Sequence, residues 1–267
     1  MRFPQTTSTI MQTTKKILRV LFPVLFWIGI WELAAWKLNN VLLFPNPRIV
    51  LKTLWELMQK KDFYIITANS LGNVLSGILL ATLIGILLAI LTYRISFLYD
   101  LFVPLMTVIK ATPVASFIVL LLIWIGSDKV PSVITFLIVL PVVWTNLDEG
   151  LRQQDPKLSQ VADIFGFSAI KRIRLLTIPS VRPYFLSACR SSFGLAWKAG
   201  VAAEIIAMPR ETIGTMIGQA KLYLNTEEMF AWTLTVIVLS LLLELGIVKL
   251  IKRLEQKRMG GILHAEN

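Results

Sequence analysis

Long runs of apolar residues alternate with short polar segments along most of the chain. The clearest run lies between Asp62 and Arg94, reads FYIITANSLGNVLSGILLATLIGILLAILTY, and contains no charged residue. A transmembrane helix needs about 20 mostly apolar residues, so this run is long enough to cross a bilayer. Similar runs predict six spans, at about 18–37, 66–93, 97–126, 130–147, 180–207 and 229–250. The pattern therefore predicts an all-α integral membrane protein forming a single transmembrane domain over residues 1–267.

The predicted third span contains two prolines, Pro104 and Pro113. A proline inside a helix removes a backbone hydrogen bond and clashes with the preceding turn, so we expect kinks. A kinked span suits the wall of a transport pathway, and it equally suits plain packing between helices.

One polar segment, residues 46–62 (NPRIVLKTLWELMQKKD), has the features of a helix too short to span. Asn46 is a suitable N-cap, and Pro47 suits the first helical position. The apolar residues that share one face at helical spacing are Val50, Leu51, Leu54, Trp55 and Met58. We interpret this segment as an amphipathic helix lying in the outer membrane interface.

The second non-spanning segment, residues 148–179, reads DEGLRQQDPKLSQVADIFGFSAIKRIRLLTIP. Asp155 and Pro156 predict the start of a short helix, and Gly166 predicts its end. Ser168 is expected to cap a second helix, which Pro179 is expected to end. The segment offers an apolar surface to a partner or to a neighbouring part of the chain. This surface is formed by Leu158, Val161, Ala162, Phe165 and Phe167. An equally open interpretation is a loop helix lying on lipid headgroups.

Charge predicts the orientation of these segments. The chain carries a net charge of +11, with Lys and Arg concentrated in residues 152–182 and from Lys249 onward. Basic residues accumulate in cytoplasmic loops of membrane proteins, although a third cluster over residues 37–61 weakens the signal. We therefore place both termini and the 148–179 segment in the cytoplasm, and we assign the basic excess to membrane orientation rather than to nucleic-acid binding.

The sequence offers little for catalysis or metal binding. It contains one cysteine, Cys189, and one histidine, His264, which excludes an intrachain disulfide and most metal clusters. It contains no G-x-x-x-x-G-K-[S/T] phosphate-binding loop. We therefore predict no catalytic, cofactor-binding or metal site, and no ATP hydrolysis by the chain itself.

Ionisable residues inside the predicted spans are candidates for a transport pathway, because they are costly there and often functional. Lys110 lies three residues before Pro113 in the third span, and Lys198 and Glu204 lie in the fifth. Lys198 and Glu204 are six residues apart and so do not share a helix face. Lys110 and Lys198 either favour an anionic substrate or have structural roles, by pairing with a carboxylate or by reaching an interface. Arg190 also lies in the fifth span.

The 148–179 segment resembles the cytoplasmic loop of permeases of binding-protein-dependent ABC importers. The pattern of that loop is E-A-A, then three residues, G, nine residues, I, one residue and L-P. Gly166 and Pro179 match, with Gln160, Val161 and Ala162 at the E-A-A positions and Leu176 and Ile178 at the apolar ones. Gln160 thus replaces the glutamate of that pattern. The stretches LFPNPRIVLKTLWEL, IKATPVASFIVLLLIWIG, LPVVWTNLDEG and GLAWKAGVAAEIIAMPRETIGTMI resemble the nitrate/sulfonate/taurine subgroup.

This resemblance implies a fold like that of type I (MetI-like) importer permeases, and a subunit in the plasma (cell inner) membrane that imports a small solute by alternating access. It implies a homodimer, two copies of an ATPase that bind ATP and Mg, and an extracytoplasmic solute-binding protein. The solute would be a sulfonate, nitrate, another small anion or a vitamin precursor. The residues it places at the ATPase contact are Leu158, Gln160, Val161, Ala162, Phe165, Gly166, Phe167, Ser168, Ile178 and Pro179. The alternatives are an ion-driven secondary transporter and a membrane scaffold without a substrate.

Overall fold

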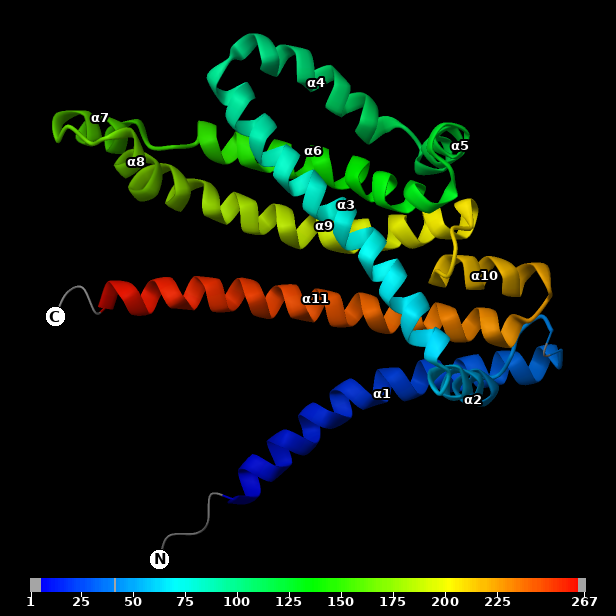
Figure 1. Ribbon diagram of the computed structural model, residues 1–267. Helices are drawn as coiled ribbons and strands as arrows, with labels where there is room; N and C mark the ends of the chain where they lie inside the picture. Colours follow the sequence, from blue (N-terminus) through cyan, green and yellow to red (C-terminus); the bar gives the residue numbers. More distant parts are fainter. Residues whose placement is uncertain (1–5, 41, 264–267) are drawn as a thin grey trace, which may run out of the picture.

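The computed structural model describes residues 6–40 and 42–263, with side chains at residues 19, 22–40 and 42–249. Its elements are helices (Figure 1). The first of them are α1 (Thr6–Leu38), α2 (Pro47–Met58), α3 (Lys61–Arg94), α4 (Ser96–Ala111), α5 (Val114–Ile125) and the short η1 (Ser127–Lys129). They are followed by α6 (Val130–Arg152), α7 (Pro156–Ile164), α8 (Ala169–Arg172), the π-helical η2 (Ile173–Thr177), α9 (Ile178–Ala207), α10 (Ile213–Leu222) and α11 (Thr226–Leu263). His264 lies outside the described residues.

The centre of the fold is α6, which packs against α3 on one side and α9 on the other. Small residues let these helices approach closely, as is usual inside membranes. At Gly77 of α3, an added Cβ would overlap the backbone oxygen of Ser132 on α6. The backbones of α3 and α6 therefore touch at a point where no larger residue fits.

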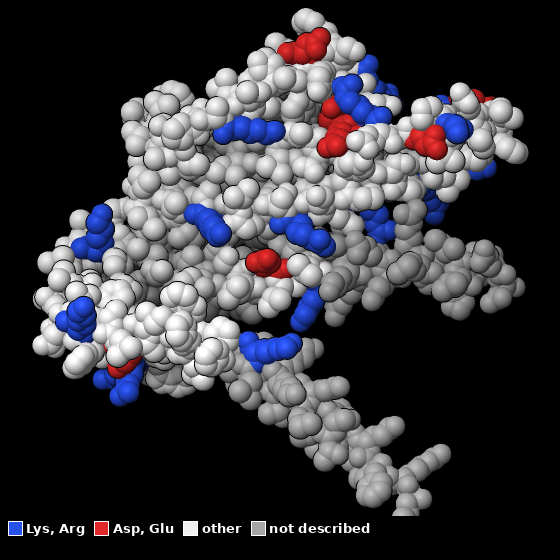
Figure 2. Space-filling view, turned by 180° about the vertical axis from the view of Figure 1, so that it is seen from behind, with Lys and Arg blue, Asp and Glu red and all other residues white. Residues whose placement is uncertain are grey.

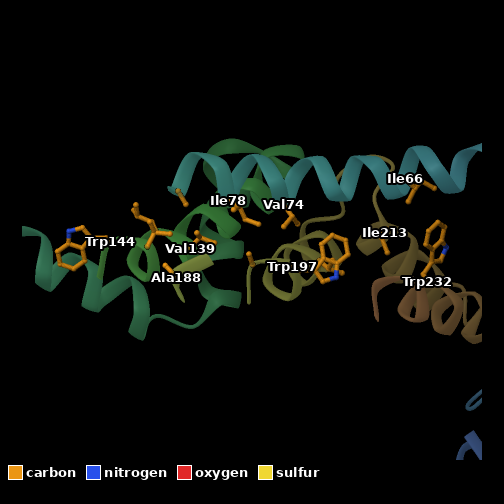
Figure 3. Close-up of a cluster of buried hydrophobic side chains, with 14 of the residues drawn as sticks. Ile66, Val74, Ile78, Val139, Trp144, Ala188, Trp197, Ile213 and Trp232 are labelled. Atoms are coloured by element: carbon orange, nitrogen blue, oxygen red, sulfur yellow. The ribbon is translucent and has the colours of Figure 1, made fainter. Parts of the chain in front are cut away.

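The buried apolar side chains form a row along α3 rather than a central ball (Figure 3). Two tryptophans in the row are held by hydrogen bonds as well as by packing. The indole Nε1 of Trp144 donates to Thr92 Oγ1 at 3.1 Å, and that of Trp197 donates to the backbone oxygen of Val236 at 3.1 Å. The first bond joins α6 to α3 and the second joins α9 to α11.

The helices give the molecule two distinct ends (Figure 1). α7 and α8 lie at one end, together with the beginning of α1 and the end of α11. α2 and α10 lie at the opposite end. The face seen in Figure 2 is mostly uncharged between the two ends, with isolated charged side chains.

Three helices in the described residues are long and apolar enough to cross a membrane: α3, the combined η1–α6, and α11. α4 and α5 meet the same criterion only as a pair, and they are bent by 102° at their junction. The predicted third span over residues 97–126 is thus not one straight helix. Pro104 lies within α4 without ending it. The chain breaks at Thr112, because the α conformation is disfavoured before Pro113.

The predicted N-cap of α2 is confirmed. Asn46 Oδ1 accepts a hydrogen bond from the backbone N–H of Ile49 at 2.9 Å, and Pro47 follows it. The helix ends at Met58 rather than near residue 62, since Lys61 already begins α3. The apolar residues of α2 lie in two different environments. Val50 is fully buried against the protein, whereas Trp55 is 65% exposed.

Candidate functional site

The helix–turn–helix predicted within residues 148–179 is present and is held by local hydrogen bonds. Asp155 caps α7 by accepting from the backbone N–H of Lys157 at 2.8 Å. At the other end Gly166 has a φ of 60°. The backbone N–H of Gly166 donates to the oxygen of Asp163, and that of Phe167 donates to the oxygen of Ala162. This pair of bonds is the Schellman motif, in which the residue with positive φ is usually glycine.

A side-chain contact fixes α7 against α8. Arg172 Nη2 lies 2.9 Å from Ser159 Oγ, 3.0 Å from the backbone oxygen of Ser159 and 2.8 Å from Asp163 Oδ1. Ser168 caps α8, as predicted, through the backbone N–H of Lys171 at 3.4 Å. The Lys171 ammonium lies 4.2 Å from the centre of the Phe167 ring. α7 and α8 are therefore joined by more than their connecting turn.

The tip of this unit exposes apolar side chains. Of the residues predicted to form its surface, Phe165 is 73% exposed, and Leu158 and Val161 are also exposed. Ala162 is buried and Phe167 is half-buried, so they support the unit from within. Ile164 and Ile170, which were not among the predicted residues, are 81% and 79% exposed. For Ile164 the signal was an apolar residue two positions after Ala162, and therefore on the opposite face of α7. Gln160 is exposed on the same helix.

Pro179 does not end the second helix, contrary to the prediction. α8, η2 and α9 run as one continuous helix from residue 169 to residue 207. The π-helical stretch directly before the proline lets the helix pass it: the backbone N–H of Ile178 donates five residues back, to Ile173. Likewise α6 continues to Arg152, so the segment between the long helices covers 153–168 rather than 148–179.

The candidate pathway residues lie in different surroundings. Lys110, near the end of α4, donates from Nζ to Thr145 Oγ1 on α6 at 2.9 Å. Pro113 forms the bend between α4 and α5. Lys198 is exposed on α9 and lines a groove between α9 and α11 together with Arg190. Lys198 therefore does not pair with Glu204.

Glu204 is fully buried and joins three elements. Its Oε2 accepts from Ser70 Oγ on α3 at 2.8 Å and from the backbone N–H of Gly214 on α10 at 3.1 Å. Its Oε1 accepts from Asn73 Nδ2 at 3.4 Å. Ser70 Oγ in turn accepts from the backbone N–H of Ile213 at 2.8 Å. The carboxylate thus accepts the free backbone N–H of Gly214 in the first turn of α10, while Ser70 accepts that of Ile213. These contacts favour a positioning role for Glu204.

Within residues 6–40 and 42–263, no three His, Cys, Asp or Glu side chains converge as metal ligands would. The structure instead contains a rigid projection with an apolar tip, formed by α7 and α8 and continuous with α9. It also contains a groove along α9 that is lined by basic residues. Such an arrangement can transmit movement and guide a charged solute.

Comparison with known proteins identifies relatives over most of the chain. The chain is 26% identical over 231 residues to the taurine transport system permease protein of Escherichia coli (strain K12), covering 84% of this chain and 83% of that protein. It is 26% identical to a putative aliphatic sulfonates transport permease protein of Bacillus subtilis (strain 168), covering 85% and 82%. It is 29% identical to the bicarbonate transport system permease protein of Synechocystis sp., covering 72% and 69%. The predicted resemblance to the taurine and sulfonate subgroup is confirmed.

Solved structures confirm the predicted fold. A chain of a bacterial ABC transporter involved in the import of the acidic polysaccharide alginate matches with a TM-score of 0.61 at 17% identity, covering 93% of this chain and 99% of that one. A chain of an amino acid ABC transporter matches with a TM-score of 0.60 at 17% identity, covering 76% and 97%. The family model of binding-protein-dependent transport system inner membrane components matches residues 81–259. The chain belongs to this family and is a multi-pass permease subunit of an ABC importer.

Proposed function

We propose that the chain works as a homodimer and that each copy binds one copy of a cytoplasmic ATPase through α7 and α8. The observation that carries this proposal is the projection itself: an apolar tip at Phe165, Ile164 and Ile170 that the chain leaves exposed. In water such a patch is unfavourable unless a partner covers it. ATP and Mg would be bound by the ATPase, since this chain lacks the lysine-containing phosphate loop.

The mechanism follows from how α7 and α8 are attached. The Schellman turn and the Arg172 contacts make α7 and α8 one rigid body. Its second helix continues through η2 into α9, so a displacement of the tip moves α9. α9 packs on α6, α10 and α11, and its movement would change which side of the membrane the pathway opens to. This is alternating access driven by the partner's ATP cycle.

The substrate is proposed to be a small solute with an anionic group. The named relatives transport taurine, aliphatic sulfonates and bicarbonate, and each of these carries an anionic oxyacid group. An extracytoplasmic solute-binding protein would deliver the substrate. One of the structurally similar transporters was solved with an alginate pentasaccharide-bound periplasmic protein.

The proposed orientation places α7, α8 and both termini in the cytoplasm, and α2 and α10 at the outer face of the plasma membrane. The basic residues of the 152–182 segment support this orientation. The exposed Trp55 of α2 suits a position in the outer interface, where tryptophan is enriched.

Co-purification and reconstitution test the proposal. The chain, expressed with the ATPase and the binding protein from the same source, should purify with two ATPase copies and take up radiolabelled taurine, methanesulfonate or bicarbonate into proteoliposomes only with ATP. Uptake driven by an ion gradient without ATP would support a secondary transporter instead. A complex that neither hydrolyses ATP nor moves any of the three solutes, with the binding protein present, would favour a scaffold.

A further inference from the structure

The groove between α9 and α11 contains two cationic side chains from the middle part of α9. It has a volume of about 260 Å³, enough for several water molecules or one small solute. Arg190 and Lys198 line it from α9, and Ser240 and Glu244 line it from α11. Trp197 and Leu243 add apolar surface to its wall.

Neither cation has a partner in the part of the chain that the structure describes. Arg190 and Lys198 are exposed, and neither forms a hydrogen bond or an ion pair with any described residue. Charged side chains within spans normally pair with one another, line a water-filled cavity or mark an ion pathway. Neither cation is ion-paired with Glu244, the carboxylate that lines the same groove, so both are available to an anionic ligand.

The helices are arranged so that both cations can reach one point. Gly194 lies four residues from each, which is about 6 Å along a helix in each direction. A Cβ added at Gly194 would meet nothing within 4 Å, so the wall between the two cations is open. The antiparallel register set by the Trp197–Val236 bond brings Ser240 level with Gly194. Long, flexible arginine and lysine side chains can converge on a small ligand there.

We propose that this groove is a subsite for a monovalent oxyanion, held over Gly194 by Arg190 and Lys198. The guanidinium fork of Arg190 matches the paired oxygens of a sulfonate or carboxylate, and the hydroxyl of Ser240 can donate a further hydrogen bond. The short organic part of such a solute would lie against Trp197 and Leu243. The inference rests on the proposed function, since it names where the imported solute is held.

Glu244 limits the charge of the subsite. It faces the same groove, and the register places it level with Arg190. With two cations and one carboxylate the groove carries a net charge of +1, which matches a singly charged anion. A site on a transport path must also release its ligand, and this neighbouring carboxylate weakens binding enough for the anion to leave.

Thiol labelling tests the subsite without requiring transport. In the full chain, C189S removes the single native cysteine. G194C then places a thiol in the groove, between Arg190 and Lys198. In nanodiscs of zwitterionic lipid we expect 2-sulfonatoethyl methanethiosulfonate to react faster than its trimethylammonium counterpart. The expected preference is about tenfold, with each rate normalised to that of a free thiol. Excess methanesulfonate at constant ionic strength should slow the reaction.

The matched variants separate this site from the general charge of the protein. R190Q/K198Q in the same background should abolish both the preference and the protection by methanesulfonate. R210Q/K221Q removes the same charge outside the groove and should leave both unchanged. Equal rates for the two reagents, no reaction with either, or a preference that survives R190Q/K198Q would each overturn the proposal.

A lipid headgroup could supply the same chemistry, and a second arm distinguishes it. If phosphatidylglycerol in the nanodiscs suppresses labelling while methanesulfonate has no effect, the occupant is a lipid phosphate and the solute subsite is wrong. Labelling needs neither ATP nor an ATPase, so its outcome is independent of the reconstitution experiment. A positive labelling result without ATP-driven uptake would retain the subsite and reject the proposed function.

Discussion

Glu204 illustrates how one residue can set the geometry of several elements. Its carboxylate is buried without a cation and is instead surrounded by Ser70, Asn73 and the backbone N–H of Gly214. We expect E204A to destabilise the protein by about 3 kcal/mol or more, because several buried donors lose their acceptor together. E204Q should cost less, since one carbonyl oxygen remains. Thermal unfolding in nanodiscs measures the difference.

The control for Glu204 is E56A, which removes an exposed glutamate that forms a surface ion pair with Lys52. Such pairs contribute roughly 0–1 kcal/mol, so the melting temperature should hardly change. If E204A and E56A melted at the same temperature, the positioning role of Glu204 would have to be abandoned.

Gly166 is the residue at which backbone conformation matters more than space. Its φ is 60°, and an added Cβ would meet nothing within 4 Å. G166A should therefore cost only the left-handed penalty of about 1–2 kcal/mol, and G166N less, because asparagine tolerates this region.

G166P should destroy the turn, since proline fixes φ near −65° and lacks the N–H that bonds Asp163. We expect G166P alone to lose ATP-driven uptake, measured beside ATPase activity in proteoliposomes. Coupled uptake by G166P at the wild-type rate would contradict the proposed role of the turn.

At the scale of elements, the capping residues were predicted correctly, whereas the effects of prolines on the course of the helices were not. Asp155, Gly166 and Ser168 act through hydrogen bonds to residues two or three positions away, so the local sequence contains their partners. The prediction for Pro179 was wrong because a π-helical stretch precedes the proline and the helix continues through it. The 102° angle between α4 and α5 could not be predicted from the sequence either, because a proline predicts a break in a helix but not the angle of the break.

The contact between α7 and α8 gives a prediction at this scale. Arg172 bridges Ser159 and Asp163, so R172A should loosen the two helices by about 1–2 kcal/mol. Because a flexible tip transmits less movement to α9, solute transported per ATP hydrolysed should fall severalfold. The control is R174A, which removes an exposed arginine of the same segment. Equal coupling ratios for R172A and R174A would show that the contact is dispensable.

At the scale of the molecule, hydrophobic runs predicted the helices but not the surfaces that they create together. The groove with Arg190 and Lys198 exists because α11 packs beside α9, and these segments are separated in sequence by α10. Lys198 was identified as a pathway candidate from its charge alone. Arg190 became informative only when the structure placed both cations around Gly194.

The position of the basic 152–182 segment at one end of the molecule predicts the orientation of the chain in the membrane. The end with α7 and α8 carries the basic 152–182 segment, and the positive-inside rule predicts that such a segment is cytoplasmic. In the C189S background, Y223C places a thiol at a site that is 82% exposed beyond α10, and F165C places one at the tip of α7. A membrane-impermeant maleimide should label Y223C in intact spheroplasts, whereas F165C should react only after permeabilisation. The reverse pattern would invert the topology and remove α7 and α8 from the reach of a cytoplasmic ATPase.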